Sequence, residues 1–139
     1  MKKFLVLGMV LLVFATTLAA CTPKEEVVYI EGEERDLVAA QAEPFLQNIL
    51  SGIANSDYAL FTKDFDEGML KAMTETQFES IVKTMGKLEQ PQSYELSNVV
   101  DKVEFYGVNY KVTYVKAVVN ILLVLPKQEP RLVSGLWFK

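Results

Sequence analysis

The chain has 139 residues, half of them apolar, and its 14 basic and 18 acidic side chains give a net charge of −4. This length suits one ordinary domain and is too short for two. The sequence has no histidine, which excludes Ser-His and Cys-His nucleophile pairs, histidine acid–base catalysis and histidine metal sites. Its seven glycines are scattered and form no glycine-rich phosphate loop. We therefore expect no cofactor, and the acidic balance argues against a nucleic-acid partner, which needs a basic patch.

Residues 1–20 have the pattern of a secretory signal. Lys2 and Lys3 precede an apolar run from Phe4 to Leu18, and two small residues follow. The alternative is a transmembrane helix that stays in the protein, but spanning a bilayer takes about 20 apolar residues and this run is shorter. We therefore expect a signal peptide. Its removal takes both lysines and leaves 12 basic against 18 acidic side chains, a net charge of −6, which opposes adhesion to anionic lipid head groups.

The tetrapeptide Leu18-Ala19-Ala20-Cys21 follows this segment directly and resembles the lipobox of bacterial lipoproteins. In those proteins the cysteine thiol receives a diacylglyceryl group, and cleavage makes the cysteine the new N-terminus. The alternative is a free or disulfide-bonded thiol, but Cys21 is the only cysteine and has no internal partner. We expect lipid on Cys21, with two or three fatty acyl chains such as palmitate, to anchor the protein to the cell membrane, facing outside the cytoplasm.

Residues 21–34 are predicted to be the lipidated cysteine and an acidic tether. Thr22 to Glu34 holds five acidic residues and one lysine, a composition typical of a solvated linker. Inside it, the apolar segment 27–30 could stay free or could dock onto the domain at a sheet edge, and both alternatives remain open. The folded domain is expected at residues 35–139.

The first predicted helix lies between Arg35 and Asn55, where apolar residues recur at steps of three and four. Pro44 falls inside this window and lacks the N–H that a helix interior needs. The helix therefore either kinks at Pro44 or begins near Ala42. Residues 55–57, Asn-Ser-Asp, are expected to end it and to cap a short second helix.

A further helix is predicted from a capping box at Thr74-Glu75-Thr76-Gln77, where the threonine hydroxyl and the glutamine amide each satisfy a free backbone N–H. Apolar residues follow at helical spacing from Phe78 to Met85. Gly86 is expected in the left-handed conformation just past the helix end.

After Pro91 the apolar period changes from 3.6 to 2, which indicates strands. Residues 107–109, Gly-Val-Asn, are expected to form a turn. Short strands joined by tight loops predict an antiparallel sheet, and helices followed by strands predict an α+β domain. We expect N-terminal helices packed on a sheet of three to four strands.

This order of elements resembles the nuclear transport factor 2-like (cystatin-like) superfamily, in particular a group of small secreted bacterial and archaeal domains of uncharacterised function. The resemblance covers residues 35–139 and is carried by Asn55–Tyr58, Met73–Phe78, Met85–Leu88 and Val133–Phe138. These motifs mark caps, turns and core faces, so the resemblance implies a fold and no activity. It implies a cone of helices against a curved sheet, often with a pocket at the wide end and often paired through the sheet.

Four aromatic residues are candidates for lining such a pocket: Tyr106, Tyr110, Tyr114 and Trp137. A pocket needs apolar walls with a few polar tips, which tyrosine and tryptophan provide. The alternative, packing in the core, is the more ordinary role for these side chains.

Two groups of acidic residues are candidates for chemical sites. Asp101 or Glu104, with one of the tyrosines, could form a carboxylate site, but strand charges usually lie on the solvated face. Asp64, Asp66 and Glu67 could hold a hard cation, but they lack the spacing of a calcium loop and fit a solvated acidic turn. We therefore assign no catalytic residue and no metal ligand.

Two function classes follow. The missing histidine and the absence of catalytic spacing favour a non-catalytic binding or interaction domain for a small ligand, a peptide or a partner protein. The alternative is a small enzyme that uses a pocket carboxylate, similar to an isomerase or a dehydratase.

The segment from Val118 to Leu125 suggests that the protein pairs with a second copy. A half-exposed antiparallel strand should alternate apolar and polar residues, yet one face carries Val119, Ile121, Leu123 and Leu125 and the other carries Val118, Asn120, Leu122 and Val124. The second face must meet a second copy, a partner, a ligand or the apolar segment of the tether. Alternatively, a strongly curved sheet wraps this strand from both sides.

Overall fold

A computed structural model describes residues 26–139, so the predicted signal peptide and Cys21 lie outside the described residues. Its elements in chain order are β1 (Val28–Ile30), α1 (Gly32–Asn55), α2 (Tyr58–Phe61), α3 (Glu67–Ala72), α4 (Glu75–Met85), the 3-10 helix η1 (Gly86–Leu88), β2 (Pro91–Lys102), β3 (Phe105–Tyr114), β4 (Val118–Pro126) and β5 (Gly135–Phe138). Within residues 26–139, no helix is both long enough and apolar enough to span a membrane.

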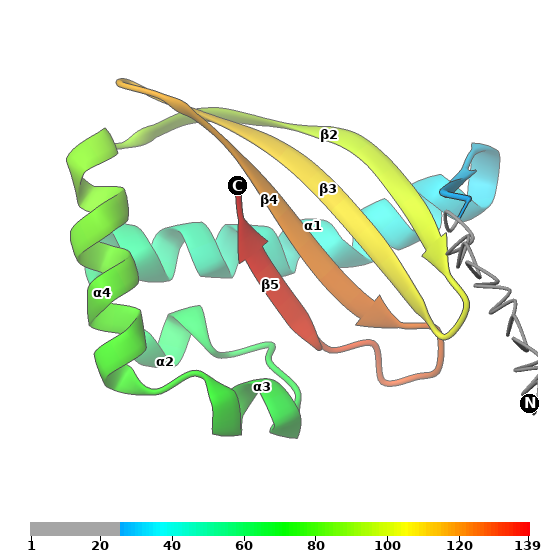
Figure 1. The fold of residues 1–139 in the computed structure, drawn as a ribbon, viewed down its shortest axis with the longest axis horizontal. Coiled ribbons are helices and arrows are strands. Elements are labelled where there is room, and N and C mark those ends of the chain that lie inside the picture. The colour runs from blue at the N-terminus through cyan, green and yellow to red at the C-terminus, as the bar shows by residue number, and fades with distance from the viewer. Residues whose placement is uncertain (1–25) are drawn as a thin grey trace, which may run out of the picture.

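The fold is α+β, as predicted. Five antiparallel strands form one open sheet in the order β1-β2-β3-β4-β5, and α1 packs along one face of it (Figure 1). The prediction of three to four strands, all after the helices, is wrong because β1 comes before α1. Val28 pairs with Asp101 and Ile30 with Val99, and Ile30 is buried in the core. The apolar segment of the tether is therefore docked, and the domain begins at β1 rather than at residue 35.

Helix α1 runs without interruption through Pro44, so it neither begins near Ala42 nor divides there. Pro44 and Ala40 are both exposed, so the Ala40 carbonyl that lacks a helical N–H partner can bond to water instead. The apolar stripe on the opposite side faces the core, and its buried members are Val38, Ala42, Leu46, Ile49, Leu50 and Ile53. Leu37 also belongs to the apolar pattern that predicted this helix, but it is 60% exposed.

Helix α4 begins with the predicted capping box. The Thr74 hydroxyl accepts a hydrogen bond from the Gln77 N–H at 3.3 Å, and the Gln77 side-chain oxygen accepts one from the Thr74 N–H at 2.8 Å. Phe78 packs its ring 4.8 Å from that of Phe61, which fixes α4 against α2. The prediction for Gly86 is wrong, since its φ is −60° and the chain continues into η1.

Strands β2 and β3 are joined by a two-residue turn, Val103-Glu104, between the paired residues Lys102 and Phe105. The turn predicted at residues 107–109 is wrong because Gly107 lies inside β3. A Cβ at Gly107 would come within 2.7 Å of a methyl carbon of Val100. Glycine is used here for close packing between strands rather than for a turn.

Candidate ligand cavity

The three candidate tyrosines lie along β3 on the side of the sheet that faces the helices, and all are buried. The Tyr106 hydroxyl donates a hydrogen bond to Glu34 at 2.8 Å, and the Tyr110 hydroxyl donates one to the Ala39 carbonyl at 3.4 Å. Trp137 lies on the opposite face, half-exposed, with its ring over Gly135. The four residues therefore do not line one pocket. The tyrosines mainly pack in the core, as the ordinary alternative expected.

The hydroxyl groups of these tyrosines are all harder to ionise than usual. The hydrogen bond to Glu34, together with burial, raises the pKa of Tyr106. Burial is the main cause that raises the pKa of Tyr110, and it alone raises the pKa of Tyr114. At neutral pH each group therefore keeps its proton. Tyr106 and Tyr110 use theirs in the two hydrogen bonds above, and the Tyr114 hydroxyl remains able to donate one.

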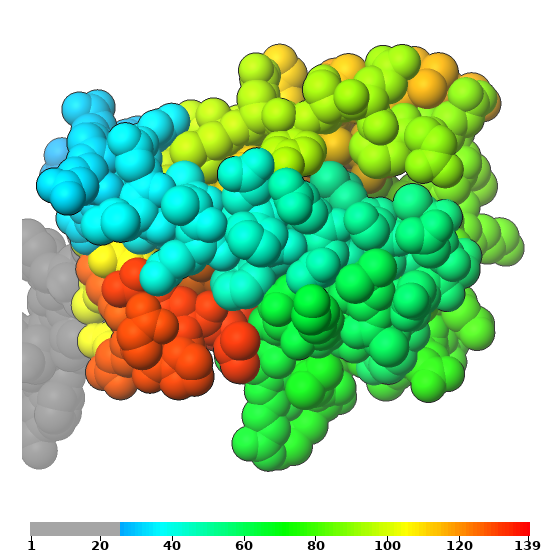
Figure 2. All heavy atoms as spheres, turned by 180° about the vertical axis from the view of Figure 1, so that it is seen from behind, coloured from blue at the N-terminus to red at the C-terminus, as the bar shows by residue number. Residues whose placement is uncertain are grey.

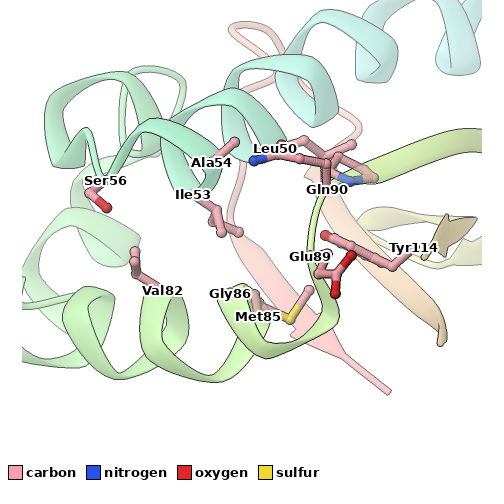
Figure 3. A pocket seen from close by; sticks show the side chains of 11 residues that line it. Leu50, Ile53, Ala54, Ser56, Val82, Met85, Gly86, Glu89, Gln90 and Tyr114 are labelled. Atoms are coloured by element: carbon pink, nitrogen blue, oxygen red, sulfur yellow. The ribbon is translucent and has the colours of Figure 1, made fainter. Parts of the chain in front are cut away.

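Tyr114 borders a cavity that has a volume of about 220 Å³ and lies between the last turns of α1 and α4 (Figure 3). Tyr110 instead contributes to a separate hollow beside α1 and β2, with Tyr94 and Leu96. It is bounded by the last turns of α1 and α4, by the segment that leads into β2, and by the end of β3. Its apolar walls are Leu50, Ile53, Ala54, Val82 and Met85, and its polar side chains are Ser56, Glu89, Gln90 and Tyr114.

Glu89 holds an unusual backbone conformation at the rim of this cavity. Its φ is 66° and its ψ is −153°, a region that is almost restricted to glycine. Its carboxylate forms an ion pair with Lys116 at 2.7 Å, and its N–H donates to the Gly86 carbonyl at 3.3 Å. Strained residues of this kind cluster at ligand sites and active sites.

The size and lining of the cavity define what it could bind. An apolar cavity of about 150 Å³ is known to bind benzene, so this space fits a molecule somewhat larger than benzene. Apolar walls on two helices would cover the body of such a ligand, while the Tyr114 hydroxyl and the Gln90 amide could donate hydrogen bonds to a polar end.

The opposite end of β3 is closed by a polar network around Tyr106. Lys127 lies over the Tyr106 ring at 5.3 Å and binds both oxygens of Asp101 at 2.7 Å. Arg131 lies over the same ring at 5.6 Å and donates to Gln41 at 2.6 Å. The bond from Lys127 lowers the pKa of Asp101. Asp101 lies on β2 opposite Tyr106 and is thus engaged in an ion pair, at the end of the sheet away from the cavity.

The other acidic candidates also lie outside the lining of the cavity. Glu104 is exposed in the β2–β3 turn. Asp64 accepts from Asn48 at 2.6 Å, Asp66 caps α3 by accepting from the Met69 N–H, and Glu67 pairs with Lys71. Within residues 26–139, no three His, Cys, Asp or Glu side chains gather so as to hold a metal ion.

The open face of the sheet is the second surface that the sequence singled out. On β4, Ile121, Leu123 and Leu125 are buried under the helices, as the alternation predicted, whereas Leu122 and Val124 are only partly buried. A shallow hollow of about 520 Å³ lies on this face, and Leu122, Val124, Val100 and Tyr29 contribute to it. Asn98 and Asn109 form a hydrogen bond of 2.8 Å there, so the surface is mixed rather than purely apolar.

Several residues of these sites were missed at the level of sequence. Glu89 was not singled out, and neither was Glu34 as the partner of Tyr106. Leu50, Ile53, Val82 and Met85 lie on predicted helices, but the spacing within each helix does not show where two helices leave a gap. Comparison with known proteins adds no further assignment, since no family model, curated protein or solved structure matches this chain.

Proposed function

We propose that this protein is a lipoprotein anchored through Cys21 to the outside of the cell membrane, and that its domain is a non-catalytic binding module. The proposal includes a helix-and-sheet cone of the nuclear transport factor 2-like (cystatin-like) type. The observation that carries the binding role is the cavity of about 220 Å³ between α1, α4 and β3, which has apolar walls and a few polar groups at its edge.

The anchor is supported by the sequence alone, through the basic and apolar segment that ends in Leu18-Ala19-Ala20-Cys21. Cell fractionation tests it. Wild-type protein should require detergent for extraction, and Cys21→Ala should move to the soluble fraction or accumulate with residues 1–20 still attached. A wild-type protein that is soluble without detergent would rule out the anchor.

The second function, a small enzyme, is favoured by one observation. Glu89 and Tyr114 line the same cavity, so a carboxylate and a hydroxyl border one ligand space. The ion pair with Lys116 already engages that carboxylate, and for this reason we prefer the binding role. Identifying the compound recovered from wild type and from Glu89→Gln separates the two functions. An enzyme would release product from wild type and substrate from the variant, whereas a binding module would release the same compound from both.

We also propose that two copies pair through the open face of the sheet. Support comes from Leu122 and Val124, which stay partly exposed, and from Trp137, which is 49% exposed. Sedimentation of wild type should show a dimer that Leu122→Lys converts to a folded monomer, because Leu122 lies outside the helix-facing core. A wild-type monomer at the highest attainable concentration would reject the pairing.

A further inference from the structure

Only a few residues lie between the proposed lipid anchor at Cys21 and the first strand of the domain. Because β1 is docked, only five residue steps separate Cys21 from Glu26, the first described residue. Whatever their conformation, five residues span no more than about 18 Å. If lipid is attached to Cys21, the end of the domain that carries β1 is held close to the bilayer.

The turn between β2 and β3 lies at this same end. Val28 on β1 pairs with Asp101, only two residues before Val103. A hollow of about 230 Å³ is lined jointly by Glu26, Val28, Asp101, Lys102 and Val103. Figures 1 and 2 both place β1 and this turn at the end of the molecule where α1 begins, away from α4.

Val103 occupies a position in this turn that folding alone does not explain. Its φ is 59° and its side chain is 80% exposed. The first central position of such a two-residue turn normally requires glycine when φ is positive, and a β-branched residue is the least suited. Valine here costs backbone strain and also exposes an apolar side chain. A local conflict of this kind points to a functional contact.

Other apolar side chains around the turn are exposed as well. They are Val27 (49%), Val28 (55%), Tyr29 (58%) and Phe105 (39%). The nearby charges are of both signs, with Lys102 beside Glu26 and Glu104. Attraction to anionic head groups therefore does not account for this surface, whereas an apolar medium does.

We infer that this end of the domain contacts the bilayer itself, with Val103, Phe105 and Val28 seated at the boundary between head groups and acyl chains. The inference rests on the proposed lipidation of Cys21. Short exposed apolar groups of this kind add to an acyl anchor by burying their surface at the interface. The contact orients the molecule. Strand β3 runs from this end to the cavity, so its ten residues place the cavity about 30 Å from the lipid, where it is open to ligands outside the membrane.

A fluorescent label tests the contact. The full chain is produced with Val103→Cys or with Val115→Cys, and the lipidated protein is labelled with a polarity-sensitive nitrobenzoxadiazole thiol reagent in phosphatidylcholine vesicles. Val115 is a matched control, because it is an exposed valine (51%) between β3 and β4, beyond the far end of β3. The label at 103 should become brighter and blue-shifted and should be quenched by lipids that carry a nitroxide in the acyl chain. The label at 115 should behave as in water.

Other results of the labelling would overturn either the membrane contact alone or the contact together with the anchor. In a lipidated chain the introduced cysteine is the only free thiol, so mass analysis should find one label. Two labels would show that Cys21 is free, which overturns the anchor and the inference together. One label, with equal emission and quenching at both positions, would overturn the membrane contact and leave the anchor intact.

Discussion

The two ends of β3 carry the same residue type in different surroundings. At one end Tyr106 donates to Glu34 and lies beneath Lys127 and Arg131, so the space between α1 and the sheet is filled by polar groups. At the other end Tyr114 borders a cavity. Each end also holds a residue other than glycine at positive φ, Val103 or Glu89. The space beneath α1 is filled at one end of β3 and left as a cavity beside α1 and α4 at the other. A strained residue lies beside each proposed contact surface.

The largest expected difference between the ends concerns two phenylalanines. Phe78 is buried and supports α4, the helix that forms one wall of the cavity, through contacts with the rings of Phe61 and Tyr58. Phe78→Ala should lower the free energy of unfolding by about 3–5 kcal/mol. Phe105→Ala, at the other end, should cost about 1 kcal/mol because that ring is already 39% exposed.

Urea unfolding of both variants checks this difference. A loss below roughly 1 kcal/mol for Phe78→Ala would show that the core does not hold α4 in the described way. Equal losses in the two variants would remove the contrast between a packed support and an exposed membrane-facing ring.

Removing a tyrosine hydroxyl at each end of β3 should give a smaller difference in the free energy of unfolding. Tyr106→Phe removes the hydrogen bond to Glu34 and should cost about 1 kcal/mol. Tyr114→Phe should change stability by less than about 0.5 kcal/mol, because burial alone accounts for its raised pKa and no charged partner is lost. Thermal unfolding of the two variants, measured side by side, shows which of them is less stable. If Tyr114→Phe is the more damaging change, its hydroxyl has a structural role that the cavity assignment does not allow.

The last expected change is a gain in the free energy of unfolding, whereas the preceding variants lose stability. Val103→Gly should raise stability by up to about 1 kcal/mol, because glycine adopts positive φ without strain. Val115→Gly, at an exposed position without positive φ, should be neutral or slightly destabilising. If Val103→Gly instead destabilises the protein, the valine contributes to folding and its position is no longer a sign of function.

Local signals in the sequence were sufficient for most of the fold. The capping box at Thr74 and the apolar period of β4 involve neighbours in the chain, so both predictions were confirmed. Pro44 did not break α1, because its exposed position lets water take the place of the missing helical bond. The turn residues misled us, since Gly107 serves close packing and the turn uses Val103 instead.

The candidate site depended on contacts that the sequence does not encode locally. The three tyrosines do share one face of β3, but the turn expected at residues 107–109 hid their alternation, and no pattern showed that Tyr114 borders the cavity beside α1 and α4. Trp137 was grouped with them because it is aromatic, although its register opposite Leu122 places it on the open face. Glu89 was missed because its conformation is set by the junction of η1 and β2 rather than by a motif.

The central claim is that the cavity holds a ligand, and native mass spectrometry of the detergent-extracted protein tests it most directly. Ala54 is exposed and lines the cavity, so Ala54→Trp should fill the space without disturbing the core. Ala72→Trp, on the exposed end of α3, is the matched control. We predict a bound small molecule on wild type and on Ala72→Trp that is lost from Ala54→Trp. A wild-type protein without a bound molecule, or one that Ala54→Trp retains equally, would contradict the account.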